Sequence, residues 1–217
     1  MNAIDIFTNL LQGLQMTVEL TVLSSAIGAL LAFVFGVGKT SHIWPVRVIS
    51  IAYVEIFRGT SLIVQLFWLY YALPLLGISL NPFVAGTAAL ALNIGAYGSE
   101  VVRGALLAVP KGQSEASLAL GFNSMQRLIR IMLPQAVPEM MPTFTNLAIQ
   151  NLKDSAIVSL ISLSDLTYYA NNLQNLTFQT VRIYTVTLFM YFVLALALSW
   201  ALGVLERYLR RWKPLVR

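Results

Sequence analysis

Three long stretches of this chain contain no Asp, Glu, Lys or Arg, and they cover residues 20–38, 59–99 and 183–205. A helix that crosses the hydrocarbon core of a bilayer needs roughly 20 predominantly apolar residues. The first and last stretches each fit one crossing, and the middle stretch is roughly long enough for two. These runs rule out an ordinary soluble domain and predict an all-α membrane protein.

The composition supports this fold class, because 58% of the residues are hydrophobic and 11% are charged, against roughly 25% charged in soluble domains. The absence of cysteine excludes disulfides and thiol nucleophiles. The net charge of +5 does not indicate nucleic acid, since basic residues crowd the C-terminal segment 207–217, as expected beside a membrane surface. Residues 1–19 lack the basic start of a signal peptide, so we expect the first apolar segment to be retained.

We predict about five transmembrane helices in one domain, with turn residues between 74 and 82 dividing the middle stretch into two. Prolines interrupt the fourth candidate, and the segment before the first is predicted to be a short interfacial helix. The segments are 1–16 (interfacial), 17–38, 59–77, 83–104, 131–150 and 183–205 (spans), 110–130 (a polar loop) and 207–217 (a basic tail).

The distribution of Lys and Arg predicts the orientation. If the N-terminus lies outside, only Lys153 and Arg182 of the 14 basic residues fall outside or within the membrane. Basic residues concentrate in cytoplasmic loops, and the opposite topology would reverse the bias. We therefore expect an external N-terminus, a cytoplasmic C-terminus and a cytoplasmic loop 110–130.

This loop is the most polar internal segment of the chain. A short helix is predicted from Gln113 to Leu120, with Gly121 ending it. Asn123 and Gln126 have the spacing of a capping box, which predicts a second short helix. Two short helices joined at a glycine form a compact knob that another protein can dock on. The alternative is a plain connector between two spans.

Five segments together resemble the permease subunits of ABC importers, in the branch that takes up polar amino acids. GQSEASLALG at 112–121, followed by IMLP at 131–134, is similar to their "EAA" loop. EIFRGTSLIVQL at 55–66, AYGSEVVRG at 96–104 and NLKDS at 151–155 resemble segments around the second, third and fourth spans of that branch. The resemblance extends over nearly the whole chain.

This resemblance implies a type I ABC-importer permease fold, in which the EAA loop couples to a cytoplasmic ATPase subunit. It implies further partners: a second permease chain, identical or homologous, an extracytoplasmic solute-binding protein, a small polar solute and the lipid of a bacterial cytoplasmic (inner) membrane. The chain lacks a GxxxxGK[ST] phosphate loop, so ATP and magnesium are expected on the partner, with no catalysis or cofactor here. The implied coupling residues are Gly112, Gln113, Glu115, Ala116, Ser117, which stands where a third alanine is usual, Gly121 and Phe122.

Polar side chains at membrane depth are costly and commonly face a cavity or a bundle interior. The candidates for a substrate pathway or gate are Gln65, Asn93, Glu100, Asn146, Gln150, Lys153 and Asp154. A zwitterionic amino acid needs partners for both of its charges.

Each of these candidates has a structural alternative. Lys153 and Asp154 can pair with each other or act as a gate, and Glu100 has the i, i+3 spacing of an ion pair with Arg103. The pair Asn146 and Gln150, at i, i+4 on one helix face, is the stronger candidate for the pathway, although such amides also form interhelical hydrogen bonds.

The function predicted from these observations is transport of amino acids or related small polar solutes, such as ectoine-like compounds, driven by a separate ATPase. The alternative is a channel or secondary transporter that works without ATP. A membrane-embedded enzyme finds no support, since no metal-ligand cluster or nucleophile–base pair is evident in the sequence. The sequence specifies neither the solute nor whether the second permease is identical.

Overall fold

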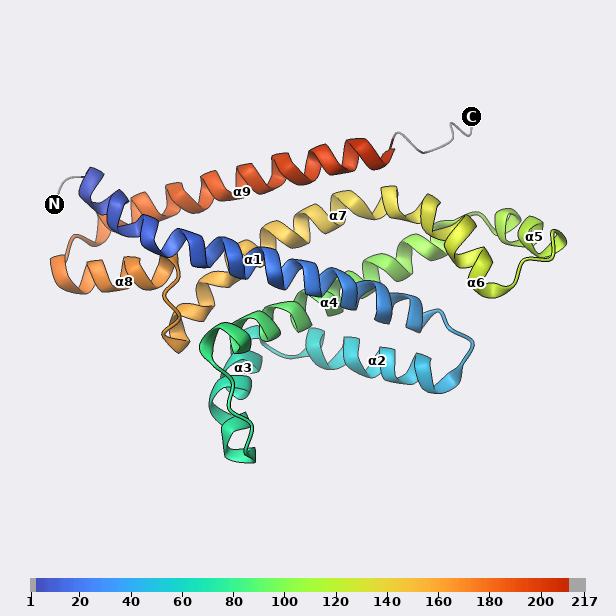
Figure 1. Cartoon of the computed structure of the whole chain (residues 1–217), viewed down its shortest axis with the longest axis horizontal. Helices are drawn as coiled ribbons and strands as arrows, with labels where there is room; N and C mark the ends of the chain where they lie inside the picture. Colours follow the sequence, from blue (N-terminus) through green and yellow to red (C-terminus); the bar gives the residue numbers. More distant parts are fainter. Residues whose placement is uncertain (1–2, 211–217) are drawn as a thin grey trace.

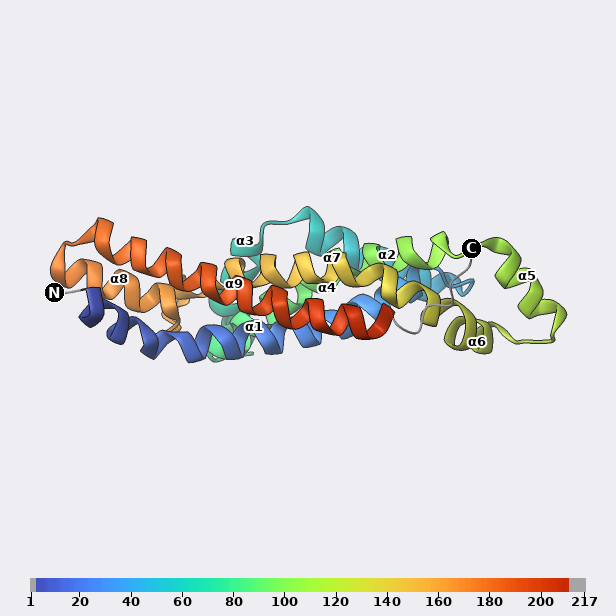
Figure 2. The same cartoon turned by 90° about the horizontal axis from the view of Figure 1, so that it is seen from above.

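The computed structural model describes the backbone of residues 3–210 and the side chains of residues 5–209. This part of the chain is mainly helical and has no strand. Most of the predicted basic tail lies outside the described residues. Four long helices pack against one another along the long axis (Figures 1 and 2), and they are α1 (Ala3–Lys39), α4 (Pro82–Ala108), α7 (Leu133–Asp154) and α9 (Thr180–Arg210).

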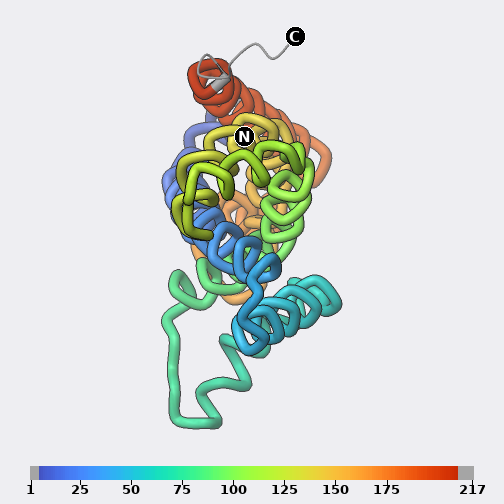
Figure 3. The backbone as a smooth tube through the Cα atoms, turned by 90° about the vertical axis from the view of Figure 1, so that its right-hand side faces the viewer, coloured from blue at the N-terminus to red at the C-terminus, as the bar shows by residue number. Residues whose placement is uncertain are grey.

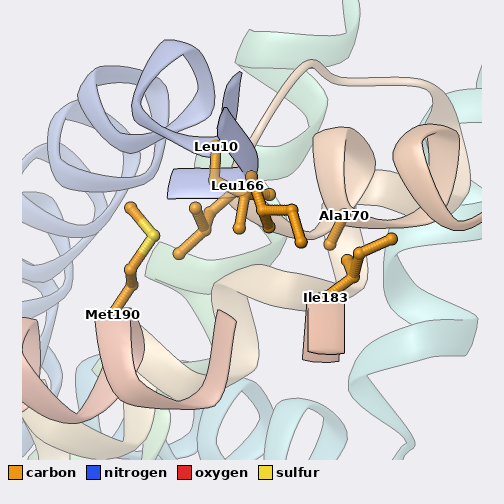
Figure 4. Packing of buried hydrophobic residues seen from close by; sticks show 6 residues of the cluster. Leu10, Leu166, Ala170, Ile183 and Met190 are labelled. Atoms are coloured by element: carbon orange, nitrogen blue, oxygen red, sulfur yellow. The ribbon is translucent and has the colours of Figure 1, made fainter. Parts of the chain in front are cut away.

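Helix α1 does not contain the separate interfacial helix expected at 1–16, because it runs unbroken from Ala3 to Lys39. Its 37 residues rise about 55 Å, which exceeds the roughly 30 Å of a bilayer core. The early turns are buried by protein: Leu10 packs with Leu166 and Ile183 in one apolar cluster (Figure 4). Part of the apolar surface of this segment, Ile6 and Leu10, therefore packs against α8 (Leu166–Thr177) and α9.

Glycines on α1 allow α1 and α4 to approach closely. A Cβ added at Gly28 would lie 2.3 Å from Ile94 Cγ2, and one at Gly36 would lie 2.7 Å from the carbonyl oxygen of Ser99. Such contacts are far inside van der Waals distance, and a backbone carbonyl cannot move aside as a side chain can. The tight α1–α4 pair forms the centre of the bundle.

We expect Gly36→Leu to destabilise the protein, because the added side chain would force α1 away from α4. Overpacking a close contact costs about 3 kcal/mol, which corresponds to a fall of roughly 10 °C in Tm for a chain of this size. Thermal unfolding of the purified chain in detergent measures this. The matched control is Gly203→Leu on α9, where an added Cβ meets nothing within 4 Å. Equal Tm values for the two variants would contradict the packing argument.

The predicted second span, 59–77, is not one straight helix. Helix α2 (Trp44–Gly59) ends where this predicted span begins, and α3 (Leu62–Phe67) starts after a two-residue break. The helical segments 44–59 and 62–76 meet at an angle of 105°. A π-helical turn (Trp68–Ala72) and a 3₁₀ segment (Leu73–Leu76) follow α3. Viewed along the bundle, this segment extends away from the other helices (Figure 3). Hydropathy reports the apolar length of this stretch but carries no information about its direction.

Among the described residues, α1 and α9 are each long and apolar enough to cross a membrane, and the bent pair 44–59 with 62–76 is a third candidate. Helices α4 and α7 have 27 and 22 residues, which give lengths of about 40 and 33 Å. Polar residues within both of them lower their mean hydropathy. The number of five crossings and the orientation of the termini therefore stay predictions.

The segment between α7 and α9 folds back onto the bundle through a 3₁₀ segment (Ser155–Ile161) and α8. The Asp165 side chain caps α8 by accepting a 2.8 Å hydrogen bond from the Tyr168 N–H. The backbone N–H of Leu166, the residue after Asp165, donates to Thr17 Oγ on α1 at 3.0 Å. The Tyr191 hydroxyl on α9 donates to the Asp165 carboxylate at 3.4 Å. The Asp165 carboxylate thus joins α8 to α9, and the neighbouring Leu166 N–H joins α8 to α1.

Burial raises the pKa of the Asp165 carboxyl from its usual 3.8 to about 6, and its hydrogen bonds offset only part of that effect. Because the pKa is raised in the fold, the protonated acid favours the fold, and this contribution is lost as pH rises from about 4 through 6. Between pH 5 and 7.5 the free energy of unfolding of the wild type should therefore fall by about 1–2 kcal/mol relative to that of Asp165→Asn. The amide oxygen of the asparagine can still cap α8. Parallel Tm–pH profiles of the two proteins in detergent would refute this assignment.

Candidate functional site

A cavity of about 640 Å³ lies where the α2–α3 break, α4 and α7 meet. Its wall mixes apolar side chains with hydroxyl, amide and carboxyl groups, and among the described residues Asp154 is the only charged one in it. Mixed walls with a few polar groups are typical of small-molecule sites. The polar residues of the wall are Thr60, Ser61, Asn93, Tyr97, Thr143, Asn146, Gln150, Asn151 and Asp154.

One face of α7 supplies four of the nine polar residues of the wall. Thr143, Asn146, Gln150 and Asp154 follow one another at spacings of three or four residues, so they form a stripe along the helix. We call these four residues the α7 stripe. The Gln150 amide donates to both oxygens of Asp154 at 3.2 Å, which orients the carboxylate toward its own helix face. Asn146 and Gln150 are exposed in this single chain, so their amides are accessible from the cavity.

Gln65 and Asn93 support the break between α2 and α3. The Gln65 amide donates to the carbonyl oxygen of Phe57 at 2.9 Å and to Thr60 Oγ at 2.7 Å. The Asn93 amide donates to the same Phe57 oxygen at 3.1 Å. Helix α2 ends here, and its last carbonyls need donors that a continuing helix would have supplied. Asn93 also reaches the cavity wall, whereas Gln65 is buried behind it.

Glu100 and Lys153, two of the predicted pathway residues, are absent from the cavity wall. Glu100 pairs with Lys39 and, at 2.8 Å, with Arg103, so the ion pair expected from the i, i+3 spacing is present. Lys153 is exposed on another face of α7 than Asp154. Every ion pair found among the described residues involves Glu100, so Lys153 and Asp154 do not pair within 4 Å.

Asn151 belongs to the junction between α7 and α1. Its amide is buried and donates to Ser24 Oγ at 2.7 Å and to Ser25 Oγ at 2.9 Å. Asn151 lies at the edge of the cavity wall beside the α7 stripe, and these bonds tie that edge of α7 to α1. Asn151 thereby fixes the rotation of α7 about its own axis.

The cavity wall also contains Thr60, Ser61, Tyr97 and Thr143, which were not among the predicted pathway residues. Thr143 has the helical spacing of Asn146 and Gln150 and could have been found from that pattern. Tyr97 carried no comparable signal; the Arg58 guanidinium lies 5.3 Å from the centre of its ring. Thr60 and Ser61 reach the wall only because the chain bends there.

The polar loop has the predicted two-helix form. Helix α5 (Lys111–Ala119) ends before Gly121, which has a φ of 76°, and α6 (Ser124–Arg127) starts with the expected capping box of Asn123 and Gln126. A positive φ favours glycine, so the turn depends on this residue. We call residues 111–127 the knob; it forms one end of the molecule (Figure 1).

The predicted coupling residues occupy different positions on the knob. Gly112, Gln113, Glu115, Ala116 and Gly121 are exposed, and Phe122 is half-buried beneath the Arg130 guanidinium. Ser117 points inward instead, since it is only 2% exposed and its hydroxyl donates to the carbonyl oxygen of Ser114. The sequence analysis did not single out two exposed leucines, Leu118 and Leu120.

Long apolar helices, a cavity with polar groups in its wall and an exposed helical knob are features found in membrane transport proteins. Residues 21–211 match the family described as the binding-protein-dependent transport system inner membrane component. The match covers most of the chain, and the chain belongs to this family.

Its relatives are permease proteins of ABC transporters. A probable amino-acid ABC transporter permease protein, y4tF, of Sinorhizobium fredii is 50% identical over 93% of this chain and 87% of its own length. The L-cystine transport system permease protein TcyB of Bacillus subtilis is 37% identical over 92% and 86%. The glutamine transport system permease protein GlnP of Escherichia coli is 31% identical over 93% of each chain.

Solved structures agree with this assignment. A crystal structure of an amino acid ABC transporter with histidines has a chain that is 36% identical, with a TM-score of 0.85 over 94% of this chain and 96% of its own. An inward-facing MetNI methionine ABC transporter has a TM-score of 0.78 over 92% and 95% at 24% identity, which is evidence of the fold alone. The fold is thus that of type I ABC permeases.

Proposed function

We propose that this chain forms the translocation path of an ATP-driven, binding-protein-dependent importer for amino acids or related small polar solutes. The observation that carries the proposal is the α7 stripe, a row of polar side chains with one carboxylate, facing a cavity of about 640 Å³. Relatives named for cystine, glutamine and other amino acids support the substrate class. Ectoine-like compounds pair the same cationic and anionic groups and stay within the proposal.

The cavity offers different chemistry for the two ends of an amino acid. Asp154 is the only anion in the wall, so the ammonium group of the solute would bind there. The carboxylate of the solute has no cation in the wall and would accept hydrogen bonds from the amides of Asn146 and Gln150 and from nearby hydroxyls. This arrangement favours cationic or zwitterionic solutes over purely anionic ones.

A second permease chain, identical or homologous, would complete the cavity. Thr143, Asn146 and Gln150 are exposed in this single chain, although α7 belongs to a bundle of apolar helices. Polar groups in contact with hydrocarbon are costly and need a protein or aqueous neighbour. Pairing along this face would cover the α7 stripe and enclose the path between two chains.

The knob is the proposed contact with the ATPase subunits. Its exposed small residues, Gly112 and Ala116, allow a partner surface to approach closely, and the exposed Leu118 and Leu120 add apolar area. ATP and magnesium would bind to those subunits, and a solute-binding protein outside the cytoplasmic membrane of a bacterium would deliver the solute. Closure of the ATPases would rock the helices between states open to either side, a general transport mechanism.

Proteoliposomes test the proposal directly. The chain, reconstituted with its ATPase and binding protein, should take up a labelled amino acid only when ATP is supplied on the ATPase side. Uptake at the same rate without ATP or without the ATPase would instead support a channel or secondary transporter, the competing function. A panel of cationic, neutral, acidic and ectoine-like solutes in the same assay would identify the substrate class.

A further inference from the structure

A second cavity, of about 400 Å³, lies at the other end of α2 from the substrate cavity. It forms where α1 ends, the chain turns into α2, and the last turns of α4 pass alongside. The turn between α1 and α2 points toward the same end of the molecule as the knob (Figure 1). The cavity wall contains three permanent cations, Lys39, Arg47 and Arg103, together with His42 and Trp44. We call it the basic pocket.

The positive charge of the basic pocket is only partly neutralised. Lys39 and Arg103 both bind the Glu100 carboxylate, and Arg58 lies 3.9 Å from the same group. One anion therefore serves three cations. Within the described part of the chain, the Arg47 side chain has no hydrogen-bond or ion-pair partner. The Lys39 side chain is only 11% exposed, so an anion in the pocket would interact with it at reduced screening.

An apolar cavity of about 540 Å³ adjoins the basic pocket, and the two share Thr40, Ser41, His42 and Leu107. Its wall is mainly apolar, with Ile43, Leu106 and Met132, and it also includes Ser124 and Arg127 of the knob. A strongly basic cavity beside an apolar one has the polarity of an amphiphile that carries an anionic head. The neighbouring Trp44 is 73% exposed, and exposed tryptophans are typical of the boundary between a bilayer and water.

We propose that the basic pocket binds the phosphate headgroup of an anionic phospholipid from the cytoplasmic leaflet, with an acyl chain against the adjoining apolar cavity. The predicted orientation puts this pocket on the cytoplasmic side, where basic pockets between membrane helices are suited to such headgroups. A free phosphate offers the same anion but leaves the apolar cavity without an occupant. The site lies apart from the α7 stripe, so it concerns regulation or anchoring of the permease and does not depend on the solute.

Native mass spectrometry of the full chain in detergent tests the proposal, with phosphatidylglycerol and phosphatidylcholine of identical acyl chains as probes. Each basic side chain near an anionic lipid surface contributes to the binding free energy, and the loss of one such contribution in Arg47→Gln should weaken phosphatidylglycerol binding about fivefold. Arg47 is exposed and does not contact Glu100, so its replacement leaves the ion pairs intact. The matched control is Arg182→Gln, an exposed arginine at the start of α9, which should bind as the wild type does.

Several outcomes overturn the proposal. Equal weakening by Arg47→Gln and Arg182→Gln would mean general electrostatic attraction without a site. Displacement of the lipid by millimolar inorganic phosphate would identify a free anion as the occupant. Unchanged lipid binding with loss of the co-purifying ATPase would assign the pocket to the partner protein. Selective loss of phosphatidylglycerol in Arg47→Gln, with phosphatidylcholine binding unchanged, is the expected result.

Discussion

The Glu115→Lys variant is expected to insert into the membrane normally but to lose its ATPase subunit and ATP-driven uptake. Glu115 is exposed on the outer surface of α5, where a reversed charge does not disturb the bundle. Removing one partner of a charge pair that is buried in an interface costs about 2–5 kcal/mol, so binding should weaken roughly 30-fold or more. Co-purification of the ATPase with the tagged permease measures the effect.

The control for this variant reverses an exposed charge of opposite sign at the far end of the molecule. Arg182→Glu alters α9 near its start and should leave both ATPase binding and uptake unchanged. Gly121→Trp provides a second disruption of the knob, since its φ of 76° suits glycine and the new side chain would project into the docking surface. Wild-type transport by both knob variants would show that the knob is only a connector.

The Asp154→Asn variant is expected to keep its ATPase subunit but to take up amino acids at least tenfold more slowly. Asp154 is the only anion in the cavity wall, and a hydrogen bond to a charged group contributes about 1.5–3 kcal/mol, or roughly 10- to 100-fold in affinity. The asparagine amide keeps the shape of the side chain but cannot neutralise an ammonium group. Concentration dependence of uptake in proteoliposomes should show the loss mainly in KM.

The adjacent residue offers a matched control for this cavity variant. Lys153→Gln also changes one charge on the last turn of α7, but Lys153 is exposed and lies outside the cavity wall. Its uptake should stay within about twofold of wild type, since surface charges away from a site contribute little. If Lys153→Gln impaired uptake as much as Asp154→Asn, the gate alternative for this pair would replace ligand binding.

The local form of the candidate site could be predicted because helical spacing is a local property. Asn146 and Gln150 are four residues apart, so any α-helix places them on one face, and the structure puts both in the cavity wall. The capping box of Asn123 and Gln126 likewise needs only residues three apart. Both features follow from the geometry of a single helix, whatever packs around it.

Other assignments required contacts between distant segments. Gln65 and Asn93 look alike in the sequence as amides in apolar helices, and both donate to the Phe57 carbonyl at the 105° bend. Only Asn93 also reaches the cavity wall, whereas Gln65 is buried. Ser117 lies within the implied docking motif but faces inward. No local pattern distinguishes an amide that satisfies a broken helix from one that faces a solute.

The sequence alone determined that the chain is helical, apolar enough for a membrane and equipped with a two-helix knob, because hydropathy, helical period and capping act over a few residues. Only the tertiary structure decided which polar groups share a cavity. Lys153 and Asp154 are neighbours in the chain, but successive residues on a helix point about 100° apart. The Asn151 bonds to α1 set the rotation of α7, so Asp154 faces the cavity and Lys153 does not.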